Sequence, residues 1–510
     1  MHGLASSLVN LFVAAVYSLL VVRLSLDYLG KQEYGLLSLL AQISTYFAIL
    51  DLGLTIAFSR ILIDYTGGSQ ERYANALRTA SLVFNFLGIV GFIFAALVAF
   101  FGTEAFSIPA NLKPVFTQLM LAQGGLLFAT FSLKAVSSPL IANGRHYIIY
   151  WVGSAAFIVN GLVFWFCLHH GLKIYSSTVG QVAAMLLNTA LMWKFTAPFR
   201  ICEAVRARFD PAIFKEVVSF SKDTVIWQIG AQTMGSLPIL LASVWFALNA
   251  TADLAAGLKL MILALSVCTR FGDMSVTPLS IEYSRGNELT AARQMTRIAG
   301  IAGGIGVCAA LFTSCSNPSF LHWWMLGKVS WSWHANLSAA VWVAILTVTQ
   351  CLYGYAAISR QLKLIRWALL AECVLYVGIA AISRYQGGPS ALLWAKPIAT
   401  LAISIYVALK LRKHTNFDTS KLLPTIIRQS IVLSILLAIG IPLSLHVSAL
   451  VDTPVLAFAA NSFLSGILVL IALPFLFTGE MRDDILGIAR TFLYKIRQIL
   501  SVSKFIRSQQ

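Results

Sequence analysis

The sequence has little charge and no tract with the composition of a linker. Only 11% of its 510 residues are Asp, Glu, Lys or Arg, whereas soluble domains usually carry about 25%. Hydrophobic residues make up 58% of the chain, and the mean hydropathy is +0.80. This composition excludes an ordinary soluble protein. Division of the length into domains of ~150 residues does not apply, because apolar runs recur from end to end.

The sequence also lacks the motifs of common enzyme and metal sites. It contains no GxxxxGK(S/T) loop, no GxSxG and no HExxH. Its cysteines are scattered singly, without a CxxC pair, so they predict neither a metal site nor a disulfide framework. They are Cys167, Cys202, Cys268, Cys308, Cys315, Cys351 and Cys373. We therefore expect no cofactor, no metal and no enzymatic activity.

Apolar runs long enough to cross a bilayer recur along the whole chain. A hydrocarbon core of ~30 Å needs roughly 20 apolar residues per helix, and fourteen such runs are present. Their centres lie near Ala14, Tyr46, Ile89, Gln123, Phe157, Met185, Gly235, Ala264, Val307, Ala344, Leu375, Ile403, Leu436 and Ser465. The first run follows no Lys or Arg and has no A-x-A cleavage site, so we expect a retained span rather than a signal peptide. The sequence therefore predicts an all-α, polytopic membrane protein with about 14 transmembrane helices.

Lysine and arginine are distributed unequally between the predicted loops. With the N-terminus in the cytoplasm, 28 of the 37 basic residues fall on the cytoplasmic side, and the positive-inside rule favours that orientation. The opposite side holds seven, namely Arg23, Lys31, Lys113, Lys173, Lys328, Arg384 and Lys396. We therefore expect a multi-pass protein of the cell inner membrane with both termini cytoplasmic. The net charge of +17 is then mostly topological and does not predict nucleic-acid binding.

A short repeat divides the predicted spans into two lobes. The chain reads IDYTGG from Ile63 and IEYSRG from Ile281, and this offset of 218 residues also places the first span on the seventh and the second on the eighth. Many transporters are built from repeated bundles, with the substrate site at the interface of the repeats. The predicted domains are an N-lobe with spans 1–6 (1–199), a basic cytoplasmic linker (200–222), a C-lobe with spans 7–12 (223–415), extra spans 13–14 (416–480) and a basic amphipathic cytoplasmic tail (481–510).

Eight ionisable residues lie within predicted spans, where such groups are costly in free energy and are functional candidates by default. They are Arg23, Asp51, Arg60, Lys134, Lys259, Arg270, Asp273 and Glu372. Structural alternatives remain for several of them. Arg23 precedes Asp27 by four residues and can form a helix-end pair, and the long side chains of Arg60 and Lys134 can reach water from near the cytoplasmic ends. Glu372 can equally be the partner of a neighbouring helix.

Three of the eight share one face of the eighth span. Arg270 and Asp273 are three residues apart, and Lys259 precedes Arg270 by eleven residues, about three turns. A face with two cations and a carboxylate favours a water-filled cavity over lipid, with a buried structural pair as the alternative. Lys259 and Arg270, together with Arg23 and Arg60 of the other lobe, predict a site for an anionic ligand. The planar fork of arginine suits phosphate or pyrophosphate especially.

The intramembrane carboxylates are interpreted as coupling or structural groups. Asp51 lies nine residues, two and a half helical turns, before Arg60, which places the two side chains on opposed faces. Asp51 therefore needs a partner from another helix, such as Lys134, or a coupling ion. Asp273 and Glu372 are likewise interpreted as coupling or structural carboxylates.

Three stretches of the chain resemble the polysaccharide flippase family, the O-antigen and lipid-linked oligosaccharide exporters related to the multidrug and toxin extrusion transporters. They are RLSLDYLGKQEYGLLSL (23–39), ILDLGLTIAFSR (49–60) and WWMLGK (323–328). With the fourteen spans and the repeat, the resemblance covers the whole chain. The sequence departs from the family in having no basic stretch before its first span.

This resemblance implies a function and a set of contacts. It implies two lobes that work by alternating access and move a polyprenyl-(pyro)phosphate-linked glycan from the inner to the outer leaflet. Arg23, Arg60 and Arg270 lie on the first, second and eighth spans, where arginines hold the pyrophosphate in related lipid-linked precursor flippases. The resemblance also implies coupling to Na⁺, H⁺ or the membrane potential, and partners in the bilayer and the polysaccharide polymerase machinery.

Two other functions remain open at the level of the sequence. A multidrug-type cation exporter of the same superfamily needs carboxylates in its cavity, whereas the intramembrane set holds five basic and three acidic residues. A membrane glycan polymerase or ligase is expected to carry a large outer loop with catalytic Arg and His. The longest outer loop here, roughly residues 314–335, is short and rich in tryptophan. Both functions therefore rank behind the flippase.

Overall fold

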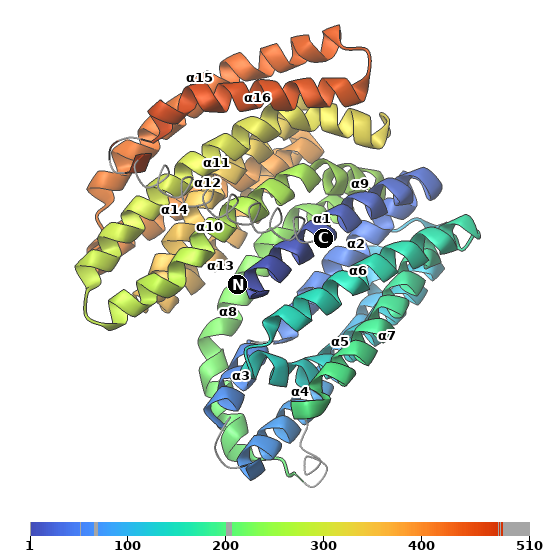
Figure 1. The fold of residues 1–510 in the computed structure, drawn as a ribbon. Coiled ribbons are helices and arrows are strands. Elements are labelled where there is room, and N and C mark those ends of the chain that lie inside the picture. The colour runs from blue at the N-terminus through green and yellow to red at the C-terminus, as the bar shows by residue number, and fades with distance from the viewer. Residues whose placement is uncertain are drawn as a thin grey trace, which may run out of the picture. The chain divides into compact units, whose positions relative to one another are not determined.

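A computed structural model describes residues 2–51, 53–65, 70–199, 207–477, 479 and 481–482, and within these ranges the regular structure is helical, without strands (Figure 1). The helices are α1 (His2–Tyr28), α2 (Lys31–Phe47), η1 (Ala48–Asp51), α3 (Leu54–Tyr65), α4 (Gln70–Ala105), η2 (Ala110–Leu112), α5 (Lys113–Ala142), α6 (His146–His169), η3 (Lys173–Tyr175), α7 (Ser176–Thr196), η4 (Ala197–Phe199), α8 (Pro211–Trp245), α9 (Leu248–Gly257), α10 (Lys259–Ser284), α11 (Glu288–Met325), α12 (Trp333–Ile358), α13 (Leu362–Gly387), α14 (Pro389–His414), α15 (Thr419–Leu450) and α16 (Pro454–Leu476). The predicted amphipathic tail, apart from residues 481–482, lies outside the described residues.

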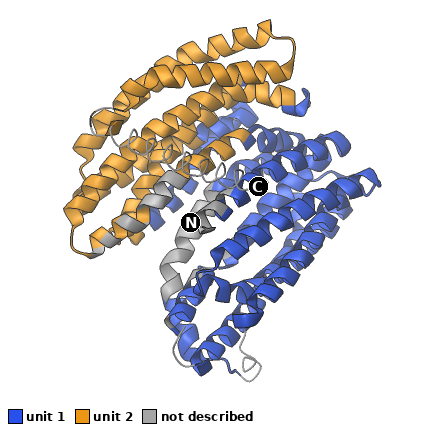
Figure 2. Cartoon of the chain, in the orientation of Figure 1, with its two compact units in different colours: residues 1–259, 324–332, 365–395 blue, residues 260–323, 333–364, 396–510 orange. Residues whose placement is uncertain are grey.

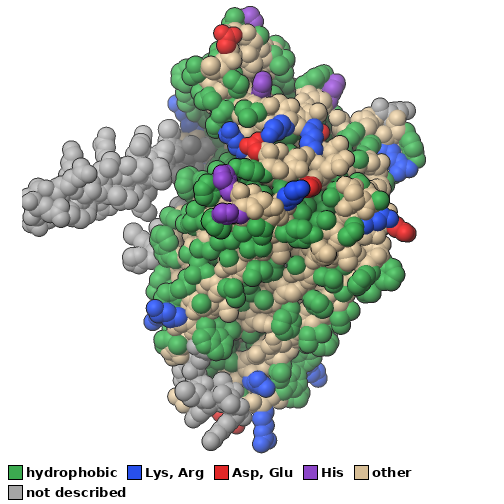
Figure 3. All heavy atoms as spheres, turned by 90° about the vertical axis from the view of Figure 1, so that its right-hand side faces the viewer, with side chains coloured by type: hydrophobic (Ala, Val, Ile, Leu, Met, Phe, Trp, Pro, Cys, Tyr) green, Lys and Arg blue, Asp and Glu red, His purple; other side chains and the backbone are tan. Residues whose placement is uncertain are grey.

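The predicted spans fall on these helices, and every one of the fourteen predicted centres is helical. Ten of the described helices are long and apolar enough to cross a membrane, and the bent pair of α9 and α10 makes an eleventh span. The other three centres lie in α2, α7 and α8, whose described residues are not both long and apolar enough to meet the same criterion. The chain is thus an all-α, multi-pass membrane protein. On the face drawn in Figure 3, hydrophobic side chains predominate, and most charged side chains gather in a band across its upper half and in a smaller group near its bottom.

The chain forms two compact units, coloured in Figure 2. Unit 1 comprises residues 1–259, 324–332 and 365–395, and unit 2 comprises residues 260–323, 333–364 and 396–510. These units follow spatial contacts, whereas the two lobes follow a repeat in the sequence, so the lobe boundaries stay a prediction. Within the predicted linker, α8 begins at Pro211, where the Asp210 side chain accepts hydrogen bonds from the first free amides of the helix.

Unit 1 is held together by helices that approach closely. α4 packs on α5, α6 packs on α7 and on α1, and α2 packs on α9. Phe47, Phe116 and Leu248 are buried in one core cluster of α2, α4, α5 and α9. The contact between α2 and α9 depends on Gly35, because a Cβ atom at this position would lie 2.1 Å from the backbone oxygen of Leu248. Small residues at helix contacts are typical of membrane bundles, since they let two backbones approach.

Unit 2 contains a core shared by α11, α12, α15 and α16. The buried Gln429 side chain of α15 joins three of these helices, because its Nε2 donates to the Gly300 oxygen at 2.8 Å and to the Leu476 oxygen at 3.2 Å. α15 begins at an N-cap, Asp418, whose side chain accepts from the Ser420 amide. Hydrogen bonding from the Ser420 side chain holds the pKa of the Asp418 carboxyl below its usual range.

We expect Gly35→Ala to destabilise the protein by about 1–3 kcal/mol, because the added methyl group must push the backbone of α9 away from α2. Gly125→Ala on α5 is the matched control, since a Cβ there meets no atom within 4 Å. The measurement is the thermal unfolding midpoint of the purified protein. Equal midpoints for the two variants would show that the contact of α2 with α9 contributes little.

Candidate functional site

The second predicted span is broken at its centre. α2 ends at Phe47, the 3₁₀ turn η1 follows, and α3 begins at Leu54. Gly53, between η1 and α3, has a φ of +71°, a left-handed conformation that glycine adopts without strain. Transporters commonly use such discontinuous helices where the backbone lines a cavity or is buried in protein. Asp51 is the last residue of η1, and it is 8% exposed.

Asp51 forms a partly buried ion pair with a second helix. The Lys134 ammonium of α5 lies 2.9 Å from Asp51 Oδ1, and the Thr55 hydroxyl donates to the same oxygen at 2.6 Å. The ammonium also lies 4.7 Å from the centre of the Phe131 ring. Of the two alternatives for Asp51, a cation from another helix or a coupling ion, the structure thus contains a contact with the first, Lys134. The argument that nine residues of continuous helix place Asp51 and Arg60 on opposed faces does not hold, because the helix is interrupted between them.

A cavity of about 410 Å³ lies beside this pair, within unit 1. It is lined by residues of α2, α5, α6 and α7, and Lys134 is the one charged residue among the described lining residues. The rest are Ser44, Phe47, Gln123, Leu126, Leu127, Thr130, Phe131, Ala156, Asn160, Gln181, Ala184, Met185 and Asn188. The cavity therefore combines four amides and two hydroxyls with an apolar wall.

A chain of hydrogen bonds runs along this cavity. The Ser44 hydroxyl donates to Gln123 Oε1 at 3.5 Å, Gln123 Nε2 donates to Gln181 Oε1 at 2.8 Å, and Gln181 Nε2 donates to the Ser177 hydroxyl at 3.2 Å. Three helices, α2, α5 and α7, are joined in this way. Asn188 is not part of this chain, and no donor of the described residues reaches its buried Oδ1.

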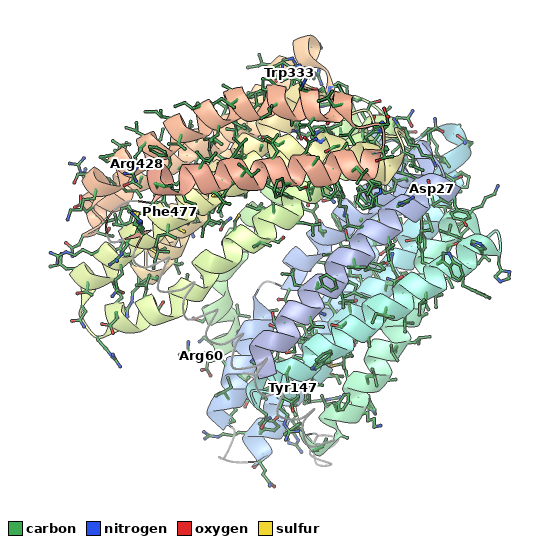
Figure 4. All side chains as sticks on the ribbon, turned by 45° about the horizontal axis from the view of Figure 1, so that its top comes forward. Asp27, Arg60, Tyr147, Trp333, Arg428 and Phe477 are labelled. Atoms are coloured by element: carbon green, nitrogen blue, oxygen red, sulfur yellow. The ribbon has the colours of Figure 1, made fainter. Side chains whose placement is uncertain are left out.

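Two of the four cations predicted for one anion site, Arg23 and Arg60, lie apart in unit 1. Arg23 Nε lies 3.8 Å from Asp27 Oδ2, the helix-end contact that was its structural alternative, and Lys328 Nζ lies 2.6 Å from Asp27 Oδ1. Arg60 is exposed on α3. Figure 4 shows Asp27 and Arg60 far apart, near opposite ends of the helices of unit 1. Arg23 and Arg60 therefore do not form a single cluster.

The eighth predicted span is also interrupted, between the end of α9 and the start of α10. The two helices meet at a 43° bend, and Lys259 is the first residue of α10. Its ammonium donates to the Ser18 hydroxyl of α1 at 3.0 Å. Arg270 and Asp273 follow on the same uninterrupted helix, and their side chains lie outside the described part of the structure. Glu372 of α13 is buried, with 2% exposed.

The sequence interpretation did not identify the neutral polar residues of the cavity. Gln123, Asn160, Gln181 and Asn188 lie within apolar helices, and this position is the available signal. This signal is weaker than that of an ionisable group, because a neutral amide costs less free energy in a bilayer than a charge. Unit 1 contains a further ion pair between helices, in which the Lys31 ammonium of α2 lies 2.9 Å from Asp253 Oδ1 of α9.

The fold occurs in solved structures of membrane transporters. A MATE family multidrug resistance transporter of the MOP superfamily, in an inward-facing conformation, matches with a TM-score of 0.69 and 11% identity over 80% of this chain and 97% of that chain. The lipid II flippase MurJ, in an inward closed conformation, matches with a TM-score of 0.69 and 12% identity over 92% of this chain and 97% of that chain.

A third solved structure, the MATE multidrug transporter DinF-BH in a complex, matches with a TM-score of 0.62 and 14% identity over 81% of this chain and 95% of that chain. No protein-family model and no curated protein matches the sequence. At these identities the likeness shows the fold alone: the chain has the fold of these MOP-superfamily proteins.

We expect Lys134→Met to destabilise the protein by about 3–5 kcal/mol, because it leaves the Asp51 carboxylate buried without its cation. The double variant Lys134→Met/Asp51→Asn removes both charges and is expected to recover most of this loss. The free energies of unfolding of the two single variants and the double variant form a cycle that isolates the pair. A double variant no more stable than Lys134→Met would show that the ion pair is not the cause.

Proposed function

We propose that the protein is a flippase that moves a polyprenyl-(pyro)phosphate-linked oligosaccharide across the cytoplasmic membrane by alternating access, for surface polysaccharide biosynthesis. The proposal unites the sequence resemblance with the fold. One observation carries it: the solved structure of a lipid II flippase matches 92% of this chain, whereas the two multidrug transporters match 80% and 81%.

The extent of this match favours a flippase because of the C-terminal helices. The unmatched 8% of the chain, about 41 residues, is shorter than the 58 residues from Thr419 to Leu476. The likeness to the flippase therefore extends into α15 or α16. The first MATE transporter leaves 20% of this chain unmatched. This is about 102 residues, which is long enough to contain both helices.

The intramembrane charges support the same proposal. A phosphate or pyrophosphate group needs cationic donors, and we propose that Arg23, Arg60, Lys259 and Arg270 supply them. Because Arg23 and Arg60 lie near opposite ends of unit 1 (Figure 4), they would contact the anion at different stages of its passage rather than together. Asp273 and Glu372 stay proposed coupling or structural carboxylates.

Orientation, energy source and partners belong to the proposal as well. The excess of basic residues in one set of loops favours cytoplasmic termini and the inner membrane. Coupling to Na⁺, H⁺ or the membrane potential is proposed, without a resident cofactor. Since Asp51 already contacts the Lys134 ammonium, we place the coupling carboxylate at Asp273 or Glu372 before Asp51. Polysaccharide polymerase machinery is the proposed protein partner.

A multidrug-type cation exporter is the second candidate, and the fold likeness to two MATE multidrug transporters favours it. An organic cation requires a carboxylate that is not already neutralised. In the cavity of unit 1, the nearby carboxylate of Asp51 is held by Lys134. This contact ranks the exporter second. Enzymatic activity, such as glycan polymerisation, is not proposed.

Loss of the gene followed by lipid analysis tests the proposed function. We expect a lipid-linked oligosaccharide to accumulate on the cytoplasmic leaflet, because its synthesis continues while its export stops. Leaflet location is measured by access of a membrane-impermeant glycan-modifying reagent in oriented vesicles. Normal lipid intermediates together with increased sensitivity to cationic drugs would refute the flippase and favour the exporter.

Arg60→Ala is expected to reduce export at least tenfold while the amount of protein in the membrane stays unchanged. Arg60→Lys should recover only part of the activity, because an ammonium lacks the planar fork that binds two phosphate oxygens at once. Arg285→Ala is the matched control, since Arg285 is exposed at the end of α10 and contacts Glu282. Full activity of Arg60→Ala, measured by glycan display at equal protein levels, would remove Arg60 from the site.

A further inference from the structure

The cavity of unit 1 has the size and construction of a ligand site. Its volume of about 410 Å³ lies within the range of roughly 300–1,000 Å³ that is usual for small-molecule sites. All of its described lining residues belong to the first 199 residues, which are part of unit 1. The site is therefore complete within one compact unit.

The positive charge at the cavity wall is balanced by a carboxylate of the protein itself. Lys134 is the charged residue among the described lining residues, and its ammonium lies 2.9 Å from the Asp51 carboxylate. A cationic ligand would be repelled by this ammonium. An anionic ligand would have to displace a carboxylate that also accepts a bond from Thr55. The cavity thus favours an uncharged ligand.

The neutral polar residues define what such a ligand must offer. An amide presents donors and an acceptor side by side, and a hydroxyl does the same on a smaller scale. Gln123, Asn160, Gln181 and Asn188 supply four amides, and Leu126, Leu127 and Met185 supply partly exposed apolar wall. A group with many hydroxyls and an apolar carbon face complements both features.

Asn188 is the one of these four amides that contacts between the described helices do not use, since Asn160 bonds the Tyr17 side chain of α1. The chain from Ser44 through Gln123 and Gln181 joins α2, α5 and α7 by itself. Asn188 adds nothing to it, and its Oδ1 is a buried acceptor that no donor of the described residues reaches. A buried acceptor without a donor destabilises a fold, so Asn188 is available to accept a hydrogen bond from a group outside the described residues.

We propose that this cavity binds an uncharged, polyhydroxylated ring, namely a sugar of the transported glycan. The assignment to the glycan rests on the proposed function, and it adds a sugar site within unit 1 to the cations that contact the phosphate. Asn188 turns its amide to contact a ligand hydroxyl, Thr130 and Gln181 contact further hydroxyls, and the partly exposed Leu126 and Met185 side chains pack against the carbon face of the ring.

Binding of simple sugars to the full chain tests this proposal. The protein is placed in nanodiscs of phosphatidylcholine, without maltoside detergent, because a maltoside carries the same hydroxyls as the probe. Methyl glycosides of glucose, galactose, mannose, rhamnose and N-acetylglucosamine are titrated, and binding is followed by saturation-transfer NMR. We expect at least one glycoside to bind with a Kd on the order of 1–10 mM.

The variants separate a ligand contact from a structural role. Asn188→Leu and Thr130→Val are each expected to weaken sugar binding at least fivefold. Gln118→Leu, an exposed amide on the same helix as Gln123, is the matched control and should leave binding unchanged. Asn188→Leu should keep or raise the unfolding midpoint, because it removes an unpaired acceptor, whereas a structural amide would lower it.

Several results would overturn the proposal. These are no saturable signal from any of the glycosides, sugar binding unchanged in Asn188→Leu, or Na⁺ binding at constant ionic strength that is lost in Asn188→Leu. The last result would make the cavity a cation site. Failure is distinguishable from failure of the proposed function, because lipid-linked glycan would still accumulate after loss of the gene. In that case the flippase stands without a sugar site in unit 1.

Discussion

Hydrocarbon offers no partner for a polar group, and most features of this protein follow from that constraint. The backbone satisfies itself by forming helices, so the described chain is helical from α1 to α16. Polar side chains form ion pairs and hydrogen bonds with other protein groups. Asp51 forms an ion pair with Lys134, Lys259 donates a hydrogen bond to Ser18, and Gln429 donates to two backbone carbonyls. Each of these contacts joins different helices, so the polar groups also fix which helices are neighbours.

The broken second span shows how this constraint shapes a site. Interrupting a helix in the bilayer frees backbone groups and exposes the residues at the break, so the break must lie against protein. Here it lies against α5, where Lys134 neutralises Asp51 and Phe131 covers the ammonium. The same neutralisation leaves the adjacent cavity without net charge. A single ion pair therefore joins the break to α5 and sets the charge beside the cavity.

Sequence and fold carry different information in this protein. Identities of 11% and 12% accompany TM-scores of 0.69, because a bundle of apolar helices tolerates any sequence that keeps apolar faces and small residues at close contacts. The side chains that select a ligand are free to differ on such a scaffold. A common fold with a lipid II flippase and with multidrug transporters therefore leaves the substrate to be decided by the site.

The sequence alone determined the helical class, the helical segments and the rare intramembrane charges, because long apolar runs and isolated ionisable groups are visible without any tertiary contact. It also indicated that Asp51 needs a partner from another helix. It offered the Arg23–Asp27 contact as an alternative, but it did not reveal that this contact lies at one end of unit 1 while Arg60 lies at the other. Nor did it reveal the cavity, whose amides come from α5, α6 and α7. Only the tertiary structure decided these features, because an amide becomes informative only when packing brings it to the wall of a shared cavity.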